Sequence, residues 1–479
     1  MPAFRLGVAL FLAATAAAPV RFASYLGGAG TDDCDGIAAD RFGYLYLACH
    51  SDSPDFPGLP PKPAPTGRDS MDGAVVKLDP RTGKIVWATR IGGSAWDAVG
   101  DLAVASDGSV YALGSSRSAD FPTTPDAVQR RFGGPDRDVI LIRLDASGKV
   151  TYSTFLGSSK NDEASSLALG RDGWVYVAGV TFAADFPGIR RGELGPRGGP
   201  DGFLARLRPG DPKSLETVLI GGSGRDQVKS IAVDSTGNLF AAGYTSSPDF
   251  PVRDAIYPHF GGELDGFVAK FRGSDLSLVF STYLGGAKID GAGALALDRD
   301  GNPIVSGTTS SDDLPTTAGA LQPHRRGPID VFLTKLDRDG RRVLWSTYFG
   351  GSKENSDQFE TGSLAVDASG RIWLSGMTAS PDFPTRVAVQ PKFGGGDFDG
   401  FLAAFSSDGA RLCFSTFLGG AGHDILEGLA SSSGRVYTSG ITASRDIAIS
   451  TPAAQTKFGG GPYDAVIFGV APPPISACR

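Results

Sequence analysis

The chain has 479 residues, of which 67 are Gly and 32 are Pro, below the level typical of disordered low-complexity chains. Hydrophobic residues make up 41 %, enough for a packed core, and the net charge of −7 disfavours a nucleic-acid-binding surface, which needs a basic excess. With only four His and four Cys, the composition excludes a His-rich metal tract and a small fold held together by disulfides.

The N-terminus has the pattern of a secretory signal peptide. Arg5 precedes an apolar run from Leu6 to Ala18 that ends in small residues, and this run is too short to span a bilayer comfortably. We expect a signal peptide at residues 1–18, cleaved near Ala17 or Ala18. The mature protein is then secreted or periplasmic and has no membrane span. A buried helix is the alternative for this run.

A phrase ending in Gly-Gly, or Gly-Ser in one copy, recurs through the rest of the chain at spacings of 64 to 69 residues. Its seven copies begin at Tyr25, Arg90, Phe155, Leu219, Tyr283, Tyr348 and Phe417. Two other features recur with the same period. One is a phrase centred on Ala, and the other is an Asp that opens an apolar run. A fixed period of this kind predicts a repeat architecture.

Each repeat contains four short runs typical of β-strands. In the second repeat they cover Leu102–Ala105, Val110–Gly114, Val139–Leu144 and Val150–Leu156. The connections within the first and last pairs have hairpin chemistry, and the runs are apolar on both faces. The pattern therefore predicts an all-β protein in which antiparallel four-stranded sheets are covered on both sides, as in a β-propeller.

The two ends of the chain indicate how the ring closes. The last repeat ends after its third strand at Asp464–Val470, and Arg21–Gly28 is a fourth-strand phrase without a partner of its own. We expect a single, monomeric seven-bladed β-propeller over residues 19–471, closed by pairing of the N-terminal strand into the last blade. A Pro-rich tail follows at 472–479. An open solenoid, which would leave sheet edges unpaired, is the alternative.

Three of the recurring phrases carry a resemblance to a known family. Ser281–Gly286, Asp120–Pro125 and Asp265–Lys270 resemble the bacterial seven-bladed β-propeller repeat, the SBBP repeat. The likeness extends from about Phe22 to Val470. It implies an exported propeller and brings no catalytic residues to transfer.

Three sets of side-chain oxygens are expected on the face formed by the longer loops. One set lies five positions after the first Gly of each phrase, a second near Phe-Pro, and a third opens the third strand. The members of the first set are Asp32, Asp97, Asp162, Asp226, Asp290, Asn355 and Asp424. Grouped carboxylates suit Ca²⁺, the only cofactor suggested here. The alternatives are that these residues fix turns by accepting backbone N–H groups, or that they contact a ligand.

Breaks in the repeat are candidate ligand-binding positions, because a single site must depart from sevenfold symmetry. The loop Lys353–Gly362 is four residues longer than its counterparts. The residues singled out are Asp357, Phe359 and Glu360 in that loop and Arg190 and Arg191 in another. An aromatic ring among charged groups suits a surface polysaccharide, a peptide or a protein. Surface loops that have merely drifted look the same.

The cysteines favour an oxidising compartment. A two-residue turn at Arg41 and Phe42 would place Cys34 directly opposite Cys49, which predicts a disulfide. A second bond, Cys413–Cys478, would pin the C-terminal tail. Free buried thiols are the alternative.

The sequence thus predicts an exported binding or scaffold protein that recognises its partner on the loop-rich face and has no catalytic activity. An extracytoplasmic carbohydrate-active hydrolase or lyase is the alternative. That alternative gains weight if carboxylates in one asymmetric pocket have strongly perturbed pKa values. The four histidines, His50, His259, His324 and His423, lie in different repeats, so no zinc set is expected.

Overall fold

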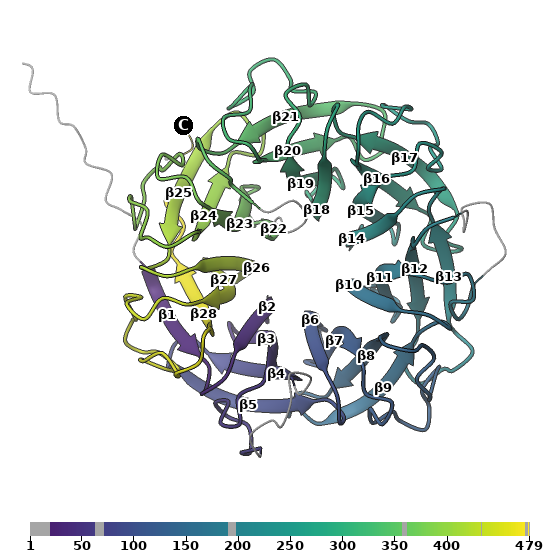
Figure 1. The fold of residues 1–479 in the computed structure, drawn as a ribbon, viewed down its shortest axis with the longest axis vertical. Coiled ribbons are helices and arrows are strands. Elements are labelled where there is room, and N and C mark those ends of the chain that lie inside the picture. Colours follow the sequence, from purple (N-terminus) through teal and green to yellow (C-terminus); the bar gives the residue numbers. More distant parts are fainter. Residues whose placement is uncertain are drawn as a thin grey trace, which may run out of the picture.

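The computed structural model describes residues 20–62, 71–189, 198–356, 362–432, 434–474 and 478. These residues form seven four-stranded antiparallel sheets arranged as blades of a ring (Figure 1). The predicted all-β seven-bladed propeller is therefore confirmed. The predicted signal peptide lies outside the described residues. Within the described part of the chain, no helix is both long and apolar enough to cross a membrane.

The strands of each blade follow one another from the middle of the ring to its rim (Figure 1). The inner strands are β2 (Asp32–Ala39), β6 (Asp97–Val104), β10 (Asp162–Leu169), β14 (Asp226–Val233), β18 (Asp290–Leu297), β22 (Leu364–Val366) and β26 (Asp424–Ser432). The second strands are β3 (Leu45–Ser51), β7 (Val110–Ser116), β11 (Val175–Thr181), β15 (Leu239–Thr245), β19 (Pro303–Thr309), β23 (Ile372–Thr378) and β27 (Arg435–Thr442).

The third strands are β4 (Asp72–Asp79), β8 (Asp138–Leu144), β12 (Asp201–Leu207), β16 (Asp265–Phe271), β20 (Asp330–Leu336), β24 (Asp399–Phe405) and β28 (Asp464–Val470). The outer strands are β5 (Lys84–Ile91), β9 (Val150–Leu156), β13 (Glu216–Ile220), β17 (Leu278–Leu284), β21 (Val343–Phe349), β25 (Leu412–Leu418) and β1 (Val20–Leu26). We number the blades 1 to 7 by their inner strands in this order.

The ring closes as predicted. β1 pairs antiparallel with β28, so that Val20 lies opposite Val470 and Leu26 opposite Ala465. The first strand of the chain is thus the outer strand of blade 7. This pairing joins the two ends of the chain and closes the ring.

The core consists of the side chains packed between neighbouring blades. All seven residues of β12 are buried, because each blade is covered on both faces. One buried cluster combines Tyr176 and Leu204 of blade 3 with Val228 and Phe267 of blade 4. Neighbouring blades therefore share their apolar contacts.

The inner strands begin earlier than the sequence pattern predicted. β6 starts at Asp97 rather than Leu102, since a β-bulge between Val99 and Asp101 interrupts the alternation of the side chains. The same irregularity occurs in β2 between Asp33 and Gly36. The bulges matter because they lie beside the candidate functional residues.

Both predicted cysteine pairs are bonded, Cys34 to Cys49 and Cys413 to Cys478. The expected two-residue turn between the first pair is wrong. Asp40 N donates to Tyr44 O at 3.0 Å, which leaves three residues in the loop, the last of them Gly43 at a φ of 84°.

This longer turn alone would put Cys34 out of register with Cys49. Gly36 lies opposite Ala48, but Asp33 lies opposite His50, because the bulge in β2 shifts the register by one residue. The bulge therefore brings the two cysteines together and turns Asp33 toward His50.

Candidate functional site

Each blade junction buries two polar side chains against one glycine. One opens the third strand of a blade and the other opens the inner strand of the next blade. The junction pairs are Asp464/Asp32, Asp72/Asp97, Asp138/Asp162, Asp201/Asp226, Asp265/Asp290, Asp330/Asn355 and Asp399/Asp424. A methyl group on Gly27 would lie 2.7 Å from both Asp32 Oδ2 and Asp464 Oδ1. The first Gly of the recurring phrase thus leaves room for the pair.

The residues predicted as calcium ligands accept hydrogen bonds that hold the loops. Asp226 Oδ2 accepts Gly222 N–H and the Ser247 hydroxyl, both at 2.8 Å. Equivalent bonds reach Asp32, Asp97, Asp290 and Asp424. These contacts support the turn-fixing interpretation, and calcium binding stays a prediction.

Blade 3 departs from this pattern twice, and the two changes compensate. Ala183 occupies the position at which other blades carry the serine, and Ser158 replaces the second Gly of the phrase. The Ser158 hydroxyl donates to Asp162 Oδ2 at 2.8 Å. The buried carboxylate therefore keeps its hydroxyl donor from a different position in the chain.

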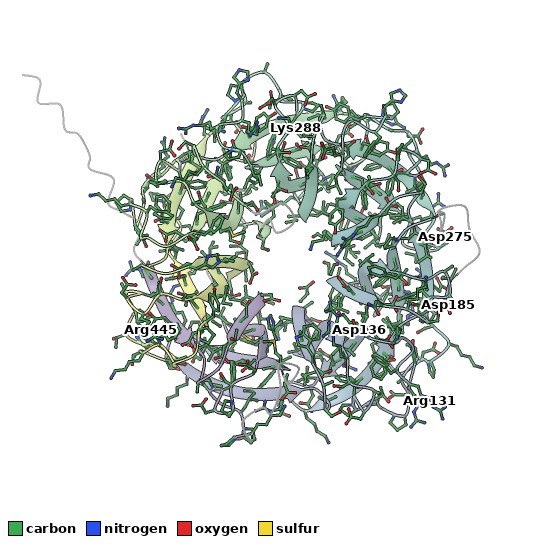
Figure 2. The ribbon with its side chains drawn as sticks, in the orientation of Figure 1. Arg131, Asp136, Asp185, Asp275, Lys288 and Arg445 are labelled. Carbon is green, nitrogen blue, oxygen red and sulfur yellow. A yellow bond between two sulfur atoms is a disulfide. The ribbon has the colours of Figure 1, made fainter. Side chains whose placement is uncertain are left out.

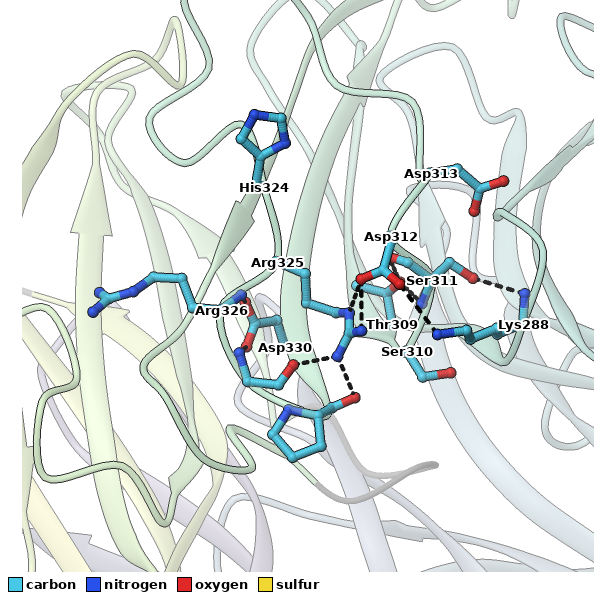
Figure 3. Close-up of polar contacts among 12 residues, drawn as sticks. Lys288, Thr309, Ser310, Ser311, Asp312, Asp313, His324, Arg325, Arg326 and Asp330 are labelled. Carbon is cyan, nitrogen blue, oxygen red and sulfur yellow. Dashed lines mark hydrogen bonds and ion pairs between the residues drawn. The ribbon is translucent and has the colours of Figure 1, made fainter.

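The acidic residues near Phe-Pro also hold loops. Asp249 Oδ1 accepts Ser223 N–H at 2.7 Å, and Asp382 Oδ1 accepts Ser352 N–H at 2.9 Å. Figure 3 shows a more exposed neighbour in blade 5, Asp312, between Lys288 and Arg325. The three predicted sets of oxygens therefore lie at the starts of strands or in the adjoining loops, and many of them accept hydrogen bonds from backbone or hydroxyl donors.

Five junction pairs contain buried carboxylate oxygens without a hydrogen-bond partner. These atoms are the Oδ1 atoms of Asp97, Asp201, Asp226, Asp265, Asp290, Asp399 and Asp464. Burial, reinforced by the neighbouring carboxylate, raises the pKa of Asp201 and Asp399 to about 7 and that of Asp265 and Asp464 to about 6. Near neutral pH Asp201 and Asp399 therefore hold a proton for much of the time.

Two junctions supply a side-chain donor to the carboxylate that opens the third strand. Asn355 Nδ2 donates to Asp330 Oδ1 at 2.9 Å, and Arg326 N–H donates to Asp330 Oδ2 at 2.8 Å (Figure 3). Asp72 is bound by Lys62 and by Arg90, whose Nη1 lies 2.9 Å from Oδ2. Asn355 thus shows which group suits the space between the two side chains, namely one that carries a hydrogen-bond donor.

A different cluster, which breaks the sevenfold symmetry, lies at the inner end of blade 1. Asp33 and Asp35 on β2 flank Cys34, and His50 on β3 follows Cys49. We call Asp33, Asp35 and His50 the inner-rim cluster. His50 Nδ1 lies 3.7 Å from Asp35 Oδ2, and Nε2 lies 3.9 Å from Asp33 Oδ2. The Cys34–Cys49 disulfide links β2 to β3 at the positions next to Asp33 and His50.

No other blade repeats this combination at the paired positions of its inner and second strands. The residues equivalent to Asp33 are Ala98, Glu163, Gln227, Gly291, Ser356 and Ile425. Those equivalent to His50 are Ser115, Val180, Tyr244, Thr308, Met377 and Ile441. The cluster is therefore not part of the repeated scaffold.

The inner-rim cluster opens into a pocket of about 390 Å³ between blades 1, 2 and 3. Asp35 and His50 line it together with Trp96, Arg137 and Glu163. The Arg137 guanidinium lies 4.8 Å from the centre of the Trp96 ring and 3.2 Å from Glu163 Oε1. The pocket thus combines an aromatic face with charges of both signs.

A second arginine also lies near the Trp96 ring. Arg117 is 5.6 Å from the Trp96 ring and 3.3 Å from Asp136 Oδ1. Figure 2 places Asp136 on the inner side of the ring, closer to its middle than Arg131 or Lys288. The charged groups around Trp96 therefore gather toward the centre of the propeller.

Burial and neighbouring charges perturb the pocket's titratable groups. Burial raises the pKa of Asp33, and the nearby imidazole only partly offsets this effect. Burial acts to lower the pKa of His50, but Asp35 and Asp33 outweigh it, so the net shift is upward. Burial also raises the pKa of Asp101, another pocket residue, to about 6.

The ligand-binding residues predicted from the sequence, Asp357, Phe359, Glu360, Arg190 and Arg191, lie outside the described residues. The inner-rim cluster was not predicted from the sequence, because it contains a single histidine beside carboxylates rather than several histidines. A signal was present in the hairpin of the first disulfide, where both cysteines adjoin the acidic or imidazole residues.

The comparison with protein families agrees with the repeat pattern. The SBBP family model, described as a beta-propeller repeat, matches residues 21–57 and 217–251. Two segments of this seven-bladed propeller thus match the SBBP repeat. The two matched segments lie in different parts of the ring, blades 7 and 1 for one and blades 3 and 4 for the other.

A curated relative of this propeller is the "Regulatory protein FlaEY" of Caulobacter vibrioides. It is 27 % identical over 356 residues, which make up 70 % of this chain and 35 % of the relative. The chain therefore spans about a third of the length of the curated relative that it matches.

Solved propellers with little sequence similarity also match. BamB from Moraxella catarrhalis is 13 % identical, with 95 % of this chain and 99 % of that chain covered and a TM-score of 0.39. The WD40 propeller domain of Doa1 is 10 % identical, with 93 % and 96 % covered and a TM-score of 0.45. Likenesses at this level say nothing about the function of this propeller.

Proposed function

We propose that this propeller is an exported binding module that recognises its ligand in the pocket between blades 1, 2 and 3 and carries out no catalysis. The observation that supports this proposal is the break in symmetry at that pocket. Trp96, Arg137 and His50 occupy positions at which no other blade carries the same side chain. A repeated scaffold needs none of these groups, whereas a single binding site does.

The lining of the pocket indicates the class of ligand. Trp96 offers a half-buried ring, and Arg137, Glu163 and Asp35 offer donors and acceptors around it. An apolar face with a few convergent polar groups suits an extended polar ligand. A surface polysaccharide or a peptide segment of a protein partner fits this chemistry.

Two further observations support an exported binding role. The disulfides Cys34–Cys49 and Cys413–Cys478 are stable in the periplasm or outside the cell and rare in the cytosol. The name of the Caulobacter relative, a regulatory protein, agrees with binding rather than with catalysis. We propose that the chain acts as a monomer and, given its net charge of −7, does not bind nucleic acid.

The test is retention of the mature protein on insoluble polysaccharides, peptidoglycan and whole cell envelopes. We expect selective retention, and we expect Trp96→Ala to weaken it about tenfold, as loss of an aromatic anchor does. Phe42→Ala is the matched control, because Phe42 is an aromatic residue that is 60 % exposed in the turn between β2 and β3, at the opposite end of the blade.

Full retention of the Trp96→Ala variant would show that the ligand binds outside the pocket. The double variant Asp357→Ala, Phe359→Ala then tests the position first predicted from the sequence. Failure of the wild-type protein to bind any of these materials would leave a soluble protein partner or a purely structural role.

A hydrolase or lyase is the second candidate, because Asp101 in the pocket has a pKa raised to about 6. Asp101 also accepts hydrogen bonds from Leu102 N–H and Leu167 N–H, at 2.8 and 2.7 Å, and thereby joins blades 2 and 3. The junction carboxylates have similar pKa shifts, so the shift alone does not distinguish catalysis from structure. Release of soluble fragments from a retained polymer, lost in Asp101→Asn, would favour the enzyme.

A further inference from the structure

We propose that Asp33, Asp35 and His50 form a binding site for one divalent transition-metal ion, with Glu427 of blade 7 beside it. One candidate ligand atom from each of the three residues lies within 4.8 Å of the other two. A tetrahedral zinc ion with bonds near 2.1 Å needs its ligand atoms about 3.4 Å apart. Small side-chain rotations therefore suffice to close the site on an ion.

The charge of the cluster favours a cation. The carboxylates of Asp33 and Asp35 face a single imidazole, and Glu427 interacts directly with Asp33. The nearby Arg137 is paired with Glu163. Placing several carboxylates close together in a partly buried site costs free energy. A bound divalent ion offsets that cost.

Two ligand-type atoms in the cluster are buried and make no hydrogen bond, namely Asp33 Oδ1 and His50 Nδ1. Buried polar atoms are normally satisfied by hydrogen bonds, so such atoms need an explanation. The Asp33 residue is only 8 % exposed. A metal ion bound between them satisfies both atoms at once.

The backbone holds the ligand-bearing residues in place before any ion arrives. Asp33 lies directly opposite His50 in the sheet, and the Cys34–Cys49 bond ties the two strands at the adjacent positions. A disulfide between ligand-bearing strands reduces the ordering that binding would otherwise require. The pocket of about 390 Å³ gives the ion a path of entry, because Asp35 and His50 both line it.

The donor set selects the class of ion. An imidazole nitrogen with carboxylate oxygens suits Zn²⁺, Co²⁺ and similar ions, whereas Ca²⁺ and Mg²⁺ prefer oxygen ligands alone. The junction pairs are poorer candidates, because they lack a nitrogen ligand and most of their oxygens already accept hydrogen bonds. The inference concerns only this chain and an ion, and it stands whether or not the pocket binds a polymer.

The experiment uses the full chain without an affinity tag and with its disulfides oxidised, freed of metal by a chelator and then dialysed. Zn²⁺ is titrated by calorimetry, and Co²⁺ by its visible absorption spectrum. We expect one ion per chain, and binding at least about tenfold weaker in His50→Ala and in Asp35→Asn. His324→Ala and Asp300→Asn, which alter exposed residues elsewhere, should bind as the wild type does.

Thermal unfolding of each variant checks that it is folded, and His50→Gln supplies a second variant that keeps the volume of the side chain. Absence of Zn²⁺ and Co²⁺ binding by the folded wild type would overturn the proposal. So would unchanged affinity in both His50 variants, or a preference for Ca²⁺ over Zn²⁺.

Discussion

The blade junctions and the inner-rim cluster both bring acidic side chains together, but in different ways. The junction pairs recur around the whole ring, and each is held by a glycine, a backbone N–H and, in most blades, a serine hydroxyl. The inner-rim cluster occurs in one blade and contains a histidine and a disulfide. Repetition marks the first as scaffold, and departure from repetition marks the second as the functional candidate.

The comparison also limits what a perturbed pKa can establish. Burial raises the pKa of Asp201 to about 7 at a junction, and it raises the pKa of Asp33 in the cluster as well. The two places differ in their partners rather than in the direction of the shift. Asp201 has a carboxylate neighbour that holds a loop by hydrogen bonds, whereas Asp33 faces an imidazole that lines a pocket.

Removing a junction carboxylate should have the largest effect on stability. Asp226→Ala leaves Gly222 N–H and the Ser247 hydroxyl without their acceptor, so we expect the free energy of unfolding to fall by about 4 kcal/mol. Denaturant unfolding followed by tryptophan fluorescence measures the loss.

The matched variant Asp226→Asn should behave differently. Its amide keeps an acceptor for Gly222 N–H and offers a donor to Asp201 Oδ1, as Asn355 does for Asp330. We expect stability at pH 8 equal to or above that of the wild type. A loss as large as that of Asp226→Ala would show that the two junctions are not equivalent.

Removing the disulfide of blade 1 should have the next largest effect. Its cysteines are 15 residues apart, and for a loop of this length the Cys34→Ser, Cys49→Ser variant is expected to lose about 3 kcal/mol. The midpoint of denaturant unfolding, compared with that of Cys413→Ser, Cys478→Ser, measures it. An unchanged midpoint would mean that the sheet alone holds the inner-rim cluster.

The pH dependence of stability follows from the junction carboxyls. Asp201, Asp265, Asp399 and Asp464 have folded-state pKa values of about 6 to 7, above the value near 4 of an unfolded chain. Between these values the folded state binds more protons at these groups, so their contribution to stability is greatest in acid and falls as the pH rises from about 4 to 7. Each group contributes on the order of 1 kcal/mol per pH unit.

Unfolding free energies measured across this range test the prediction. Asp201→Asn combined with Asp399→Asn should flatten the curve, because neither amide titrates. A wild-type stability that rises from pH 5 to pH 7 would show that the exposed, hydrogen-bonded carboxylates outweigh the junction pairs.

Calcium should have the smallest effect. Metal-free protein is expected to melt at the same temperature with and without millimolar Ca²⁺, since the junction carboxylates already accept hydrogen bonds. Differential scanning calorimetry measures the two melting temperatures. A clear rise with Ca²⁺ that disappears in Asp290→Asn would instead assign the repeated residues to a cation.

The architecture of this protein could be predicted from the amino-acid sequence alone. The seven phrases, their period and the missing fourth strand of the last repeat predict the blades and the closure of β1 on β28, since hairpins and apolar runs form from local sequence. The cysteine partners were also predicted correctly, but through a turn that does not exist. The bulge that brings Cys34 opposite Cys49 leaves no clear local signal.

Only the tertiary structure decided which side chains meet across blades. Asp464 and Asp32 lie at opposite ends of the chain, yet both contact Gly27, and Glu427 reaches the hairpin of blade 1. The pocket likewise draws its residues from three blades. Such contacts depend on the packing and closure of the whole ring, because no local pattern records which neighbour a blade will meet.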